Sequence, residues 1–293
     1  MSARSAIRVM SISADLPGKK AAENQPRLFR FVAGPAETSP AAEALARYTG
    51  LSKAKVKDAM AKGAVWLHAR RGGRKRLRRA SAQLSAGDVV EFFYDARLLD
   101  MQPPTGQCLH DAGHYSVWLK PAGLLAQGTD YGDHCSLLRQ VELFFGRKRP
   151  VLPVHRLDRE ASGIMLVAHS RDAAARLSLL LQENRIEKRY RITVTGRLDR
   201  IEGGIDLPLD GKAAETRYRV DAYDPASDSS VVEVEISSGR LHQIRRHFAL
   251  IGHPVLGDPR YGRGNKNKEG MRLVAYFLAF RCPFTGKDLC FTI

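Results

Sequence analysis

The sequence predicts an α+β protein in two parts: a small α/β domain at the N-terminal side, followed by a larger domain built on a large, mixed and mainly antiparallel central sheet. Two observations predict this. Strand patterns recur through the second half of the chain with few helical patterns between them, and two short helical patterns with following strands occupy the first third. The 293 residues allow two cores, and 44% hydrophobic residues exclude a chain dominated by disorder.

The chain begins with a polar stretch, residues 1–35, that has no regular period and predicts a flexible leader with one candidate strand from Leu28 to Val32. The next segment predicts a helix. Ser39 is a preferred N-cap residue, Pro40 suits the first helical position, and Gly50 is typical of a helix end. We therefore start the small domain at residue 36.

A second helical pattern follows at once. Ser52 is suited to cap it, Val56 and Met60 supply its apolar face, and Gly63 ends it before a strand pattern from Ala64 to His68. The lysines of this helix are expected to face solvent: Lys53, Lys55, Lys57 and Lys62.

Residues 70–79, RRGGRKRLRR, hold seven cations and no acid around a Gly-Gly turn. Such a run is often only a solvated surface, but beside the lysine-bearing helix it makes one cationic face suited to phosphate groups. The whole chain agrees, because 47 Lys and Arg against 31 Asp and Glu give a formal charge of +16, which favours a polyanionic partner. We expect nucleic-acid contacts from six side chains: Lys53, Lys57, Arg74, Arg76, Arg78 and Arg79.

The small domain closes with an apolar strand pattern from Val89 to Tyr94, and we place it at residues 36–98. Residues 99–112 contain Pro103, Pro104 and Gly106 and predict an interdomain linker. The second domain then covers residues 113–293. Its clearest patterns are strands at 115–120, 189–194 and 231–236 and helices at 171–182 and 242–251.

Composition also excludes several classes of protein. No stretch approaches the roughly 18–20 apolar residues of a membrane-spanning helix, and the N-terminus lacks the apolar core of a secretory signal. We therefore expect a cytoplasmic protein with no membrane partner. The four cysteines and nine histidines lack the spacing of zinc ligands or of a disulfide framework, so we expect no metal and no cofactor. We further expect a monomer.

The most informative segment is VHRLDREASGIMLV, residues 154–167. Ile164 to Val167 predict a buried strand, so the charged residues before it form a loop at the mouth of that strand, where proteins place chemistry. Asp158 lies between Arg156 and Arg159 in this loop. An Arg-Asp ion pair that holds a turn is the structural alternative to a reactive carboxylate.

The run HRLDR followed by Ser-Gly resembles the signature of the RluA-type pseudouridine synthases. More loosely, the two helices, the basic hairpin and the strand that contains GDVVEF resemble an S-four-like RNA-binding domain. Four further segments resemble motifs of the synthase family: KPAG at 120–123, EKRY at 187–190, SGRLHQIRRHFALIGHPVLGDPRYG at 238–262 and RLVAYFLAF at 272–280.

Membership of that family would make the protein an isomerase, an intramolecular transferase that converts uridines of structured RNA to pseudouridine, with ribosomal RNA favoured over transfer RNA. By this resemblance Asp158 is the catalytic carboxylate, Arg245 pairs with it, and Tyr190 lies beside the target base. Burial alone would protonate a carboxylate, and a guanidinium within a few ångströms reverses that preference, so the pair is physically reasonable. Attack on the ring, attack on the anomeric carbon and proton removal from the sugar all remain open.

Three further residues are expected to bind substrate: Leu273 in the base pocket, Arg156 on the flanking RNA, and Lys188. His242, at the start of the last helical pattern, is expected to be structural. The alternative function is that of a noncatalytic RNA-binding protein, for instance a ribosome-assembly factor with a retained synthase fold. The chain departs from the commoner family pattern at Ala161, Leu241 and Val274, which puts the choice of substrate in doubt.

Overall fold

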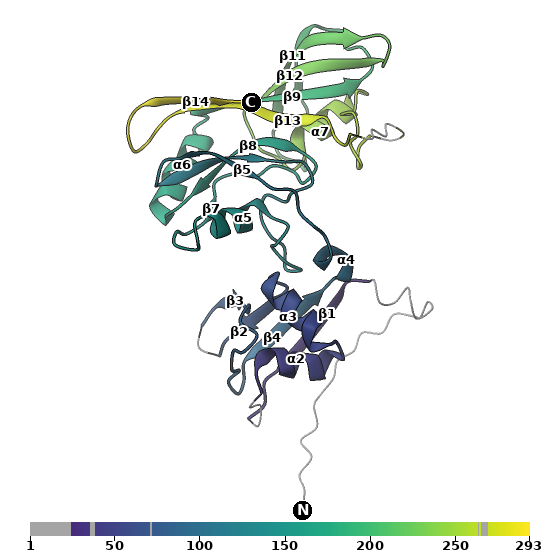
Figure 1. The fold of residues 1–293 in the computed structure, drawn as a ribbon. Helices are drawn as coiled ribbons and strands as arrows, with labels where there is room; N and C mark the ends of the chain where they lie inside the picture. The colour runs from purple at the N-terminus through teal and green to yellow at the C-terminus, as the bar shows by residue number, and fades with distance from the viewer. Residues whose placement is uncertain (1–24, 36–38, 71, 263, 265–268) are drawn as a thin grey trace, which may run out of the picture. The chain divides into compact units, whose positions relative to one another are not determined.

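The structure is a computed structural model that describes residues 25–35, 39–70, 72–262, 264 and 269–293. Most of the predicted leader, residues 1–24, lies outside the described residues. The described chain divides into two compact units. The first unit comprises the described residues up to Met101 together with Asp130–Gly132. The second comprises Gln102–Thr129 and the described residues of Asp133–Ile293. Each unit has a sheet of its own (Figure 1).

The first unit contains a four-stranded antiparallel sheet in the order β1-β4-β2-β3, with α2 and α3 packed into the same core. Val56 and Met60 of α3 contact this core together with Val90 and Phe92 of β4. The elements are β1 (Arg27–Val32), α2 (Ala41–Thr49), α3 (Lys53–Ala61), β2 (Val65–His68), β3 (Arg74–Arg76), β4 (Val89–Tyr94) and α4 (Ala96–Leu99).

Local signals explain where the two helices begin and end. The Ser52 hydroxyl accepts a hydrogen bond of 3.3 Å from the backbone N–H of Lys55, so Ser52 caps α3 as predicted. Gly50 adopts a φ of 72° at the end of α2, a conformation that glycine reaches without strain. The N-cap of α2 is Pro40 and not the predicted Ser39.

Two edge strands extend the sheets beyond the predicted domain limits. β1 confirms the candidate strand from Leu28 to Val32 and pairs with β4 along its whole length, so the first sheet begins before residue 36. β5 (Gln107–Asp111) lies in the predicted linker and pairs with β6 (Tyr115–Lys120) of the second sheet. β5 has one neighbour in the sheet and no fully buried residue, which weakens the sequence pattern that would reveal it.

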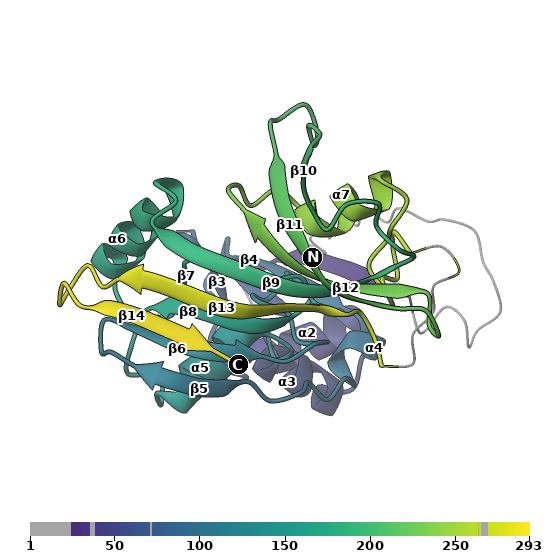
Figure 2. The same cartoon turned by 90° about the horizontal axis from the view of Figure 1, so that it is seen from above.

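The second unit is built on a ten-stranded mixed sheet in the order β10-β11-β12-β9-β13-β8-β6-β5, with β14 paired to β13 and β7 to β8. Among the described strands, only β8 and β13 pair in parallel, so the predicted α+β fold with a mainly antiparallel sheet is confirmed. Figure 2 shows β9, β13 and β14 running as neighbours. The remaining strands are β7 (Leu152–Pro153), β8 (Ser162–Ala168), β9 (Ile186–Thr195), β10 (Glu202–Asp206), β11 (Glu215–Asp224), β12 (Ser229–Ile236), β13 (Leu273–Arg281) and β14 (Asp288–Thr292).

The helices of the second unit are α5 (Leu137–Phe144), α6 (Arg171–Gln182) and α7 (Gln243–Leu250). α6 has the predicted bounds, and Ser170 caps it by accepting a 3.0 Å hydrogen bond from the backbone N–H of Ala173. α5 is not predicted, because its eight residues, LLRQVELF, are too few to show a clear helical period.

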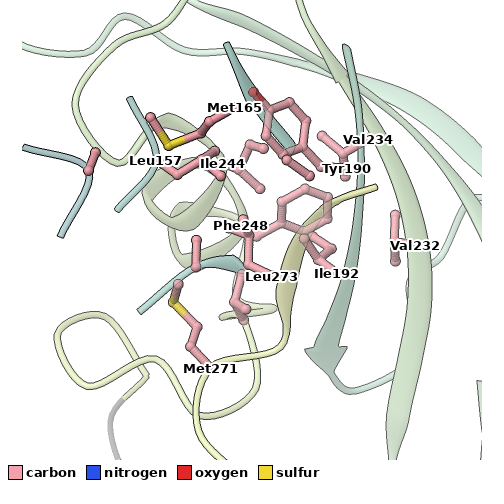
Figure 3. Close-up of a cluster of buried hydrophobic side chains, with 14 of the residues drawn as sticks. Leu157, Met165, Tyr190, Ile192, Val232, Val234, Ile244, Phe248, Met271 and Leu273 are labelled. Atoms are coloured by element: carbon pink, nitrogen blue, oxygen red, sulfur yellow. The ribbon is translucent and has the colours of Figure 1, made fainter. Parts of the chain in front are cut away.

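The middle of the sheet brings three distant segments of the chain together. Ala275 of β13 is paired on one side with Tyr190 of β9 and on the other with Gly163 of β8. Figure 3 shows Tyr190 and Leu273 beside Ile244 and Phe248 of α7, all members of one buried cluster. This packing places the loop before β8 next to α7.

Candidate active site

A cavity of about 310 Å³ in the second unit is lined by all six of the site residues that the sequence predicts in this domain. Asp158 comes from the loop before β8, Tyr190 and Lys188 from β9, and Leu273 from the start of β13. Arg245 comes from α7. The set is Arg156, Asp158, Lys188, Tyr190, Arg245 and Leu273.

Asp158 and Arg245 form a direct ion pair. Nη1 of Arg245 donates a hydrogen bond of 2.8 Å to Oδ2 of Asp158. The Arg245 side chain is only 2% exposed, whereas that of Asp158 is 17% exposed and faces the cavity. The guanidinium is therefore fixed inside the protein, and the carboxylate it holds stays within reach of a bound molecule.

A second carboxylate, Asp258, completes the arrangement around Arg245. It accepts hydrogen bonds from Nε and Nη2 of Arg245 at 2.7 and 2.9 Å, and its own side chain is fully buried. The backbone N–H groups of Arg260 and Tyr261 also donate to Oδ1 of Asp258, at 2.8 and 3.0 Å. Sequence reasoning missed Asp258, although the Gly-Asp-Pro turn that contains it is part of the longest matched segment.

The charges of this group support one another. Burial works against the charged form of Arg245, but hydrogen bonds to Asp258 and Asp158 outweigh it and raise the pKa of the guanidinium. Burial also acts to raise the pKa of Asp258, and the hydrogen bonds from Arg245 and the backbone reverse this and lower it. Both groups are therefore ionised at neutral pH.

His242 lines the same cavity, which sequence reasoning did not predict. Its backbone is in the left-handed region with a φ of 53°, an uncommon conformation for a residue with a side chain. Nδ1 lies 3.0 Å from the hydroxyl of Tyr261, and Nε2 lies 3.8 Å from Oδ1 of Asp158. Burial lowers the pKa of His242 in spite of the nearby carboxylate.

The aromatic wall of the cavity is Tyr190, which is buried beside Leu273. Burial, reinforced by the negative charge of Asp158, raises the pKa of the Tyr190 hydroxyl to about 12. The hydroxyl is therefore protonated at neutral pH. Leu273 supplies an apolar surface at the start of β13, as the sequence resemblance implied.

Two basic side chains lie close to Asp158, the half-buried His155 in the same loop and the fully buried Lys120 at the end of β6. Nε2 of His155 accepts a 3.0 Å hydrogen bond from the backbone N–H of Leu166, and burial lowers the pKa of this imidazole to about 3. Lys120 donates to the carbonyl groups of Leu124 and Ala161 at 2.8 and 2.6 Å, and burial lowers its pKa to about 8. His155 is thus neutral, and Lys120 ties two segments of loop together.

The six predicted nucleic-acid contacts of the small domain belong to the first unit, and none of them lines this cavity. Lys53 and Lys57 are exposed on α3, and Lys53 pairs with Glu43 at 3.0 Å. The guanidinium carbons of Arg74 and Arg76 both lie over the Trp66 ring, at 4.0 and 4.2 Å from its centre. Arg78 donates to the carbonyl of Ala61 and Arg79 to the hydroxyl of Ser81.

The described residues contain no group of three or more His, Cys, Asp and Glu side chains arranged to hold a metal ion. Within the same residues, every helix is too short or too polar to cross a bilayer.

Comparison with known proteins gives a consistent result. The profile of a family described as RNA pseudouridylate synthase matches residues 114–250. The chain is 30% identical over 279 residues to an uncharacterized RNA pseudouridine synthase of Aquifex aeolicus, with 84% of this chain and 86% of the relative covered. It is 32% identical to ribosomal large subunit pseudouridine synthase D of Zymomonas mobilis, with 68% of this chain and 67% of the relative covered. It is 33% identical to the dual-specificity RNA pseudouridine synthase RluA of Pasteurella multocida, with 67% of this chain and 97% of the relative covered.

Two human structures share the fold. RNA pseudouridylate synthase domain containing 1 superposes with a TM-score of 0.55 at 22% identity, covering 66% of this chain and 86% of that protein. RNA pseudouridylate synthase domain containing 4 gives a TM-score of 0.52 at 23% identity, covering 64% and 87%.

The sequence similarities thus define an RNA-modifying isomerase. The chain belongs to the RNA pseudouridine synthase family, in its RluA type, and acts on RNA. This outcome favours the enzyme over the noncatalytic RNA-binding alternative.

Proposed function

We propose that this synthase isomerises uridines of large-subunit ribosomal RNA, with Asp158 as the catalytic carboxylate, Arg245 as its partner and Tyr190 beside the base. The observation that carries the proposal is the 2.8 Å ion pair between Asp158 and the buried Arg245, in a cavity whose wall is Tyr190 and Leu273. These four residues give a reactive anion, a fixed counter-charge, an aromatic face and an apolar face.

The reaction breaks the bond from C1′ of the ribose to N1 of uracil and forms one from C1′ to C5. Asp158 can serve any of the three open routes, because each needs a carboxylate that stays ionised in a site from which water is excluded. Arg245 stabilises that anion at 2.8 Å. Because the ribose and base must enter the cavity, the target nucleotide leaves its stack.

Tyr190 and Leu273 lie on the cavity wall where the uracil ring would bind. Tyr190 stacks on the ring in this proposal, and its hydroxyl takes part in removing the C5 proton late in the reaction. At the rim, the exposed Arg156 binds the flanking RNA, where counterion release favours phosphate contacts.

Ribosomal RNA is favoured over transfer RNA by the relatives. Two of them, from Zymomonas mobilis and Nitrosomonas europaea, are ribosomal large subunit pseudouridine synthases D, whereas the Pasteurella multocida relative has dual specificity. We further propose that the first unit is an S-four-like domain that holds the RNA. Its support is the cationic face of α3 and the β2–β3 hairpin, together with the formal charge of +16.

The proposal is tested by mapping pseudouridine in total RNA from cells that lack this protein and carry either the wild-type gene or a variant. Asp158→Asn removes the anion with little change of shape, so one or more sites in large-subunit ribosomal RNA should be absent with this variant and present with wild type. Asp172→Asn is the matched control, because Asp172 is exposed on α6. Modification restored by Asp158→Asn would exclude the catalytic role, and sites confined to transfer RNA would exclude the ribosomal substrate.

A further inference from the structure

Lys188 is a half-buried lysine in the wall of the active-site cavity. It lies two residues before Tyr190 on β9, and residues two apart on a strand face the same side of the sheet. Its neighbour Arg189 faces the other side, where it donates to Glu187 at 2.7 Å and lies 3.3 Å from Glu235. The chain thus places one cation on the solvated face of the sheet and one on the face that lines the cavity.

The charge of Lys188 has no partner among the described residues. Its side chain makes no hydrogen bond or ion pair with them, and the lysine also lines a neighbouring groove where Glu215 and Glu235 lie beyond ion-pair distance. The adjacent His155 is neutral and so adds no second positive charge. A cation that is partly removed from water without a counter-ion is costly, and burial lowers the pKa of Lys188 accordingly.

An unpaired cation in a binding cavity suits a ligand that brings negative charge of its own. In RNA this charge is carried by the phosphates, or it develops on the base during the reaction. The phosphates remain near the solvent, where exposed Arg156 and Arg240 on the rim can meet them. Lys188 shares its strand face with Tyr190, which lines the wall where the base is proposed to bind, so its position favours the base.

We propose that Lys188 is a further catalytic residue whose ammonium group stabilises the negative charge that develops on the uracil ring. This inference rests on the proposed function, because it requires a uracil held against Tyr190. Preorganised charge in a site shielded from water acts more strongly than in bulk solvent, and it needs no rearrangement when the reaction occurs.

The chemistry needs such a group in every open route. When the bond from C1′ to N1 breaks, its electron pair stays on the uracil, and the charge spreads over N1, O2 and O4. If Asp158 first adds to the ring, an electron pair moves toward C5 and O4 instead. The new bond from C5 to C1′ uses the electron pair of the ring. Any bond from Asp158 to the nucleotide breaks with its electrons returning to the carboxylate, and any proton that Asp158 takes from the sugar goes back to it. C5 then loses its proton and N1 gains one. Atoms and charge therefore balance without a co-reactant.

The test uses Lys188→Met, which removes the charge, and Lys188→Arg, which keeps it. Lys148→Met is the matched control, since Lys148 is exposed on the loop after α5. The substrate is a stem-loop RNA with the ribosomal sequence around a mapped target, made with either uridine or 5-fluorouridine at that position. Fluorine stabilises the uracil anion but replaces the C5 proton, so with this RNA the rate measured is the disappearance of 5-fluorouridine.

We expect Lys188→Met to lower the single-turnover rate on uridine RNA by about 10²- to 10³-fold, the range for loss of one group that stabilises developing charge. RNA affinity and melting temperature should stay near the wild-type values. Lys188→Arg should recover at least a tenth of the wild-type rate. The loss caused by Lys188→Met should be at least tenfold smaller with 5-fluorouridine RNA, because that leaving group depends less on the lysine.

Three results would overturn the inference. Weaker RNA binding with a flatter salt dependence and an unchanged saturating rate would make Lys188 a phosphate contact. Equal losses on the two RNAs would remove the link to ring charge, and failure of Lys188→Arg with a lowered melting temperature would indicate a structural role. Wild-type enzyme assayed in parallel separates these outcomes from failure of the proposed substrate, which would leave the wild type itself inactive on the stem-loop.

Discussion

Asp258 accepts hydrogen bonds from both Nε and Nη2 of Arg245, at 2.7 and 2.9 Å, and so fixes the plane of the guanidinium group. The remaining nitrogen, Nη1, donates to Asp158 at 2.8 Å and lies 3.5 Å from Glu160. Asp258 does not line the cavity, yet it orients Arg245, and Arg245 in turn holds Asp158, which does line it. The geometry of the proposed catalytic group depends on a residue that is itself fully buried.

Asp258→Asn should damage both stability and turnover. Removal of one charge from a buried pair leaves the other uncompensated, at a cost of about 3 to 5 kcal/mol. Arg245 would also lose its fixed orientation, so we expect single-turnover rates to fall more than about tenfold, or 1.4 kcal/mol of barrier. Urea unfolding and single-turnover kinetics measure the two effects. The control is Asp210→Asn, which breaks the exposed pair of Asp210 with Arg246 and should cost less than about 1 kcal/mol.

The same carboxylate predicts a pH dependence of stability. The pKa of Asp258 is lowered in the folded protein, so its contribution is complete above its unfolded value of about 3.9 and is lost as the pH falls through the folded pKa. The free energy of unfolding of the wild type should therefore drop more steeply below pH 4 than that of Asp258→Asn. Parallel curves for the two proteins would show that Asp258 does not titrate in this way.

Tyr190→Phe separates stacking from proton transfer. The change keeps the aromatic face and removes the hydroxyl, so a residue that only stacks should lose less than about tenfold in turnover, or 1.4 kcal/mol. We expect a larger loss, because acid-base catalysis is typically worth about 10²- to 10⁴-fold. The assay is single-turnover release of tritium from 5-tritiated uridine in substrate RNA. Wild-type rates for Tyr190→Phe together with an impaired Tyr190→Leu would leave Tyr190 as a stacking surface alone.

The arginine run of the first unit predicts a change in salt dependence. Replacing Arg74, Arg76, Arg78 and Arg79 with Ala should weaken RNA binding and lower the slope of log K against log salt by about 0.7 to 0.9 for each lost phosphate contact. Lys53→Ala with Lys57→Ala tests the helix side of the same face. Circular dichroism melting is a necessary control, since Arg76 and Arg78 also donate to backbone carbonyls at the end of α3. An unchanged slope in a folded variant would mean that the run does not contact RNA.

Short-range signals made much of this structure predictable. The bounds of α6 follow from a serine cap and a helical period, and β4 and β6 follow from apolar runs with turns beside them. The motif resemblance likewise grouped Asp158, Tyr190 and Arg245, which the sheet brings to one cavity. These predictions needed only local sequence or a pattern already associated with a function.

The features that sequence did not predict depend on long-range geometry. No local pattern shows that Asp258 meets Arg245, 13 positions away, or that His242 turns into the cavity through a left-handed backbone. The parallel pairing of β8 with β13 joins segments about 110 positions apart, and only the folded sheet reveals it. The Ser162-Gly163 pair after Asp158 shows this, because the two residues pair with β13, far along the chain.

Gly163 is the point at which this long-range contact is tightest. It pairs with Ala275 of β13 and has a φ of 129°, and a Cβ added there would overlap the backbone of Ala275, with the Cα only 2.7 Å away. Gly163→Ala must therefore strain its own backbone and push β13 away from β8, which we expect to cost about 2 to 6 kcal/mol. Displacement of β13 would also move Leu273 relative to the loop of Asp158, so any folded fraction should have reduced turnover.

Gly204→Ala on β10 is the matched control, because no atom lies within 4 Å of the added Cβ and the φ of Gly204 is not positive. Urea unfolding of the two variants is the measurement, and similar stabilities would show that β8 and β13 have room for a side chain between them.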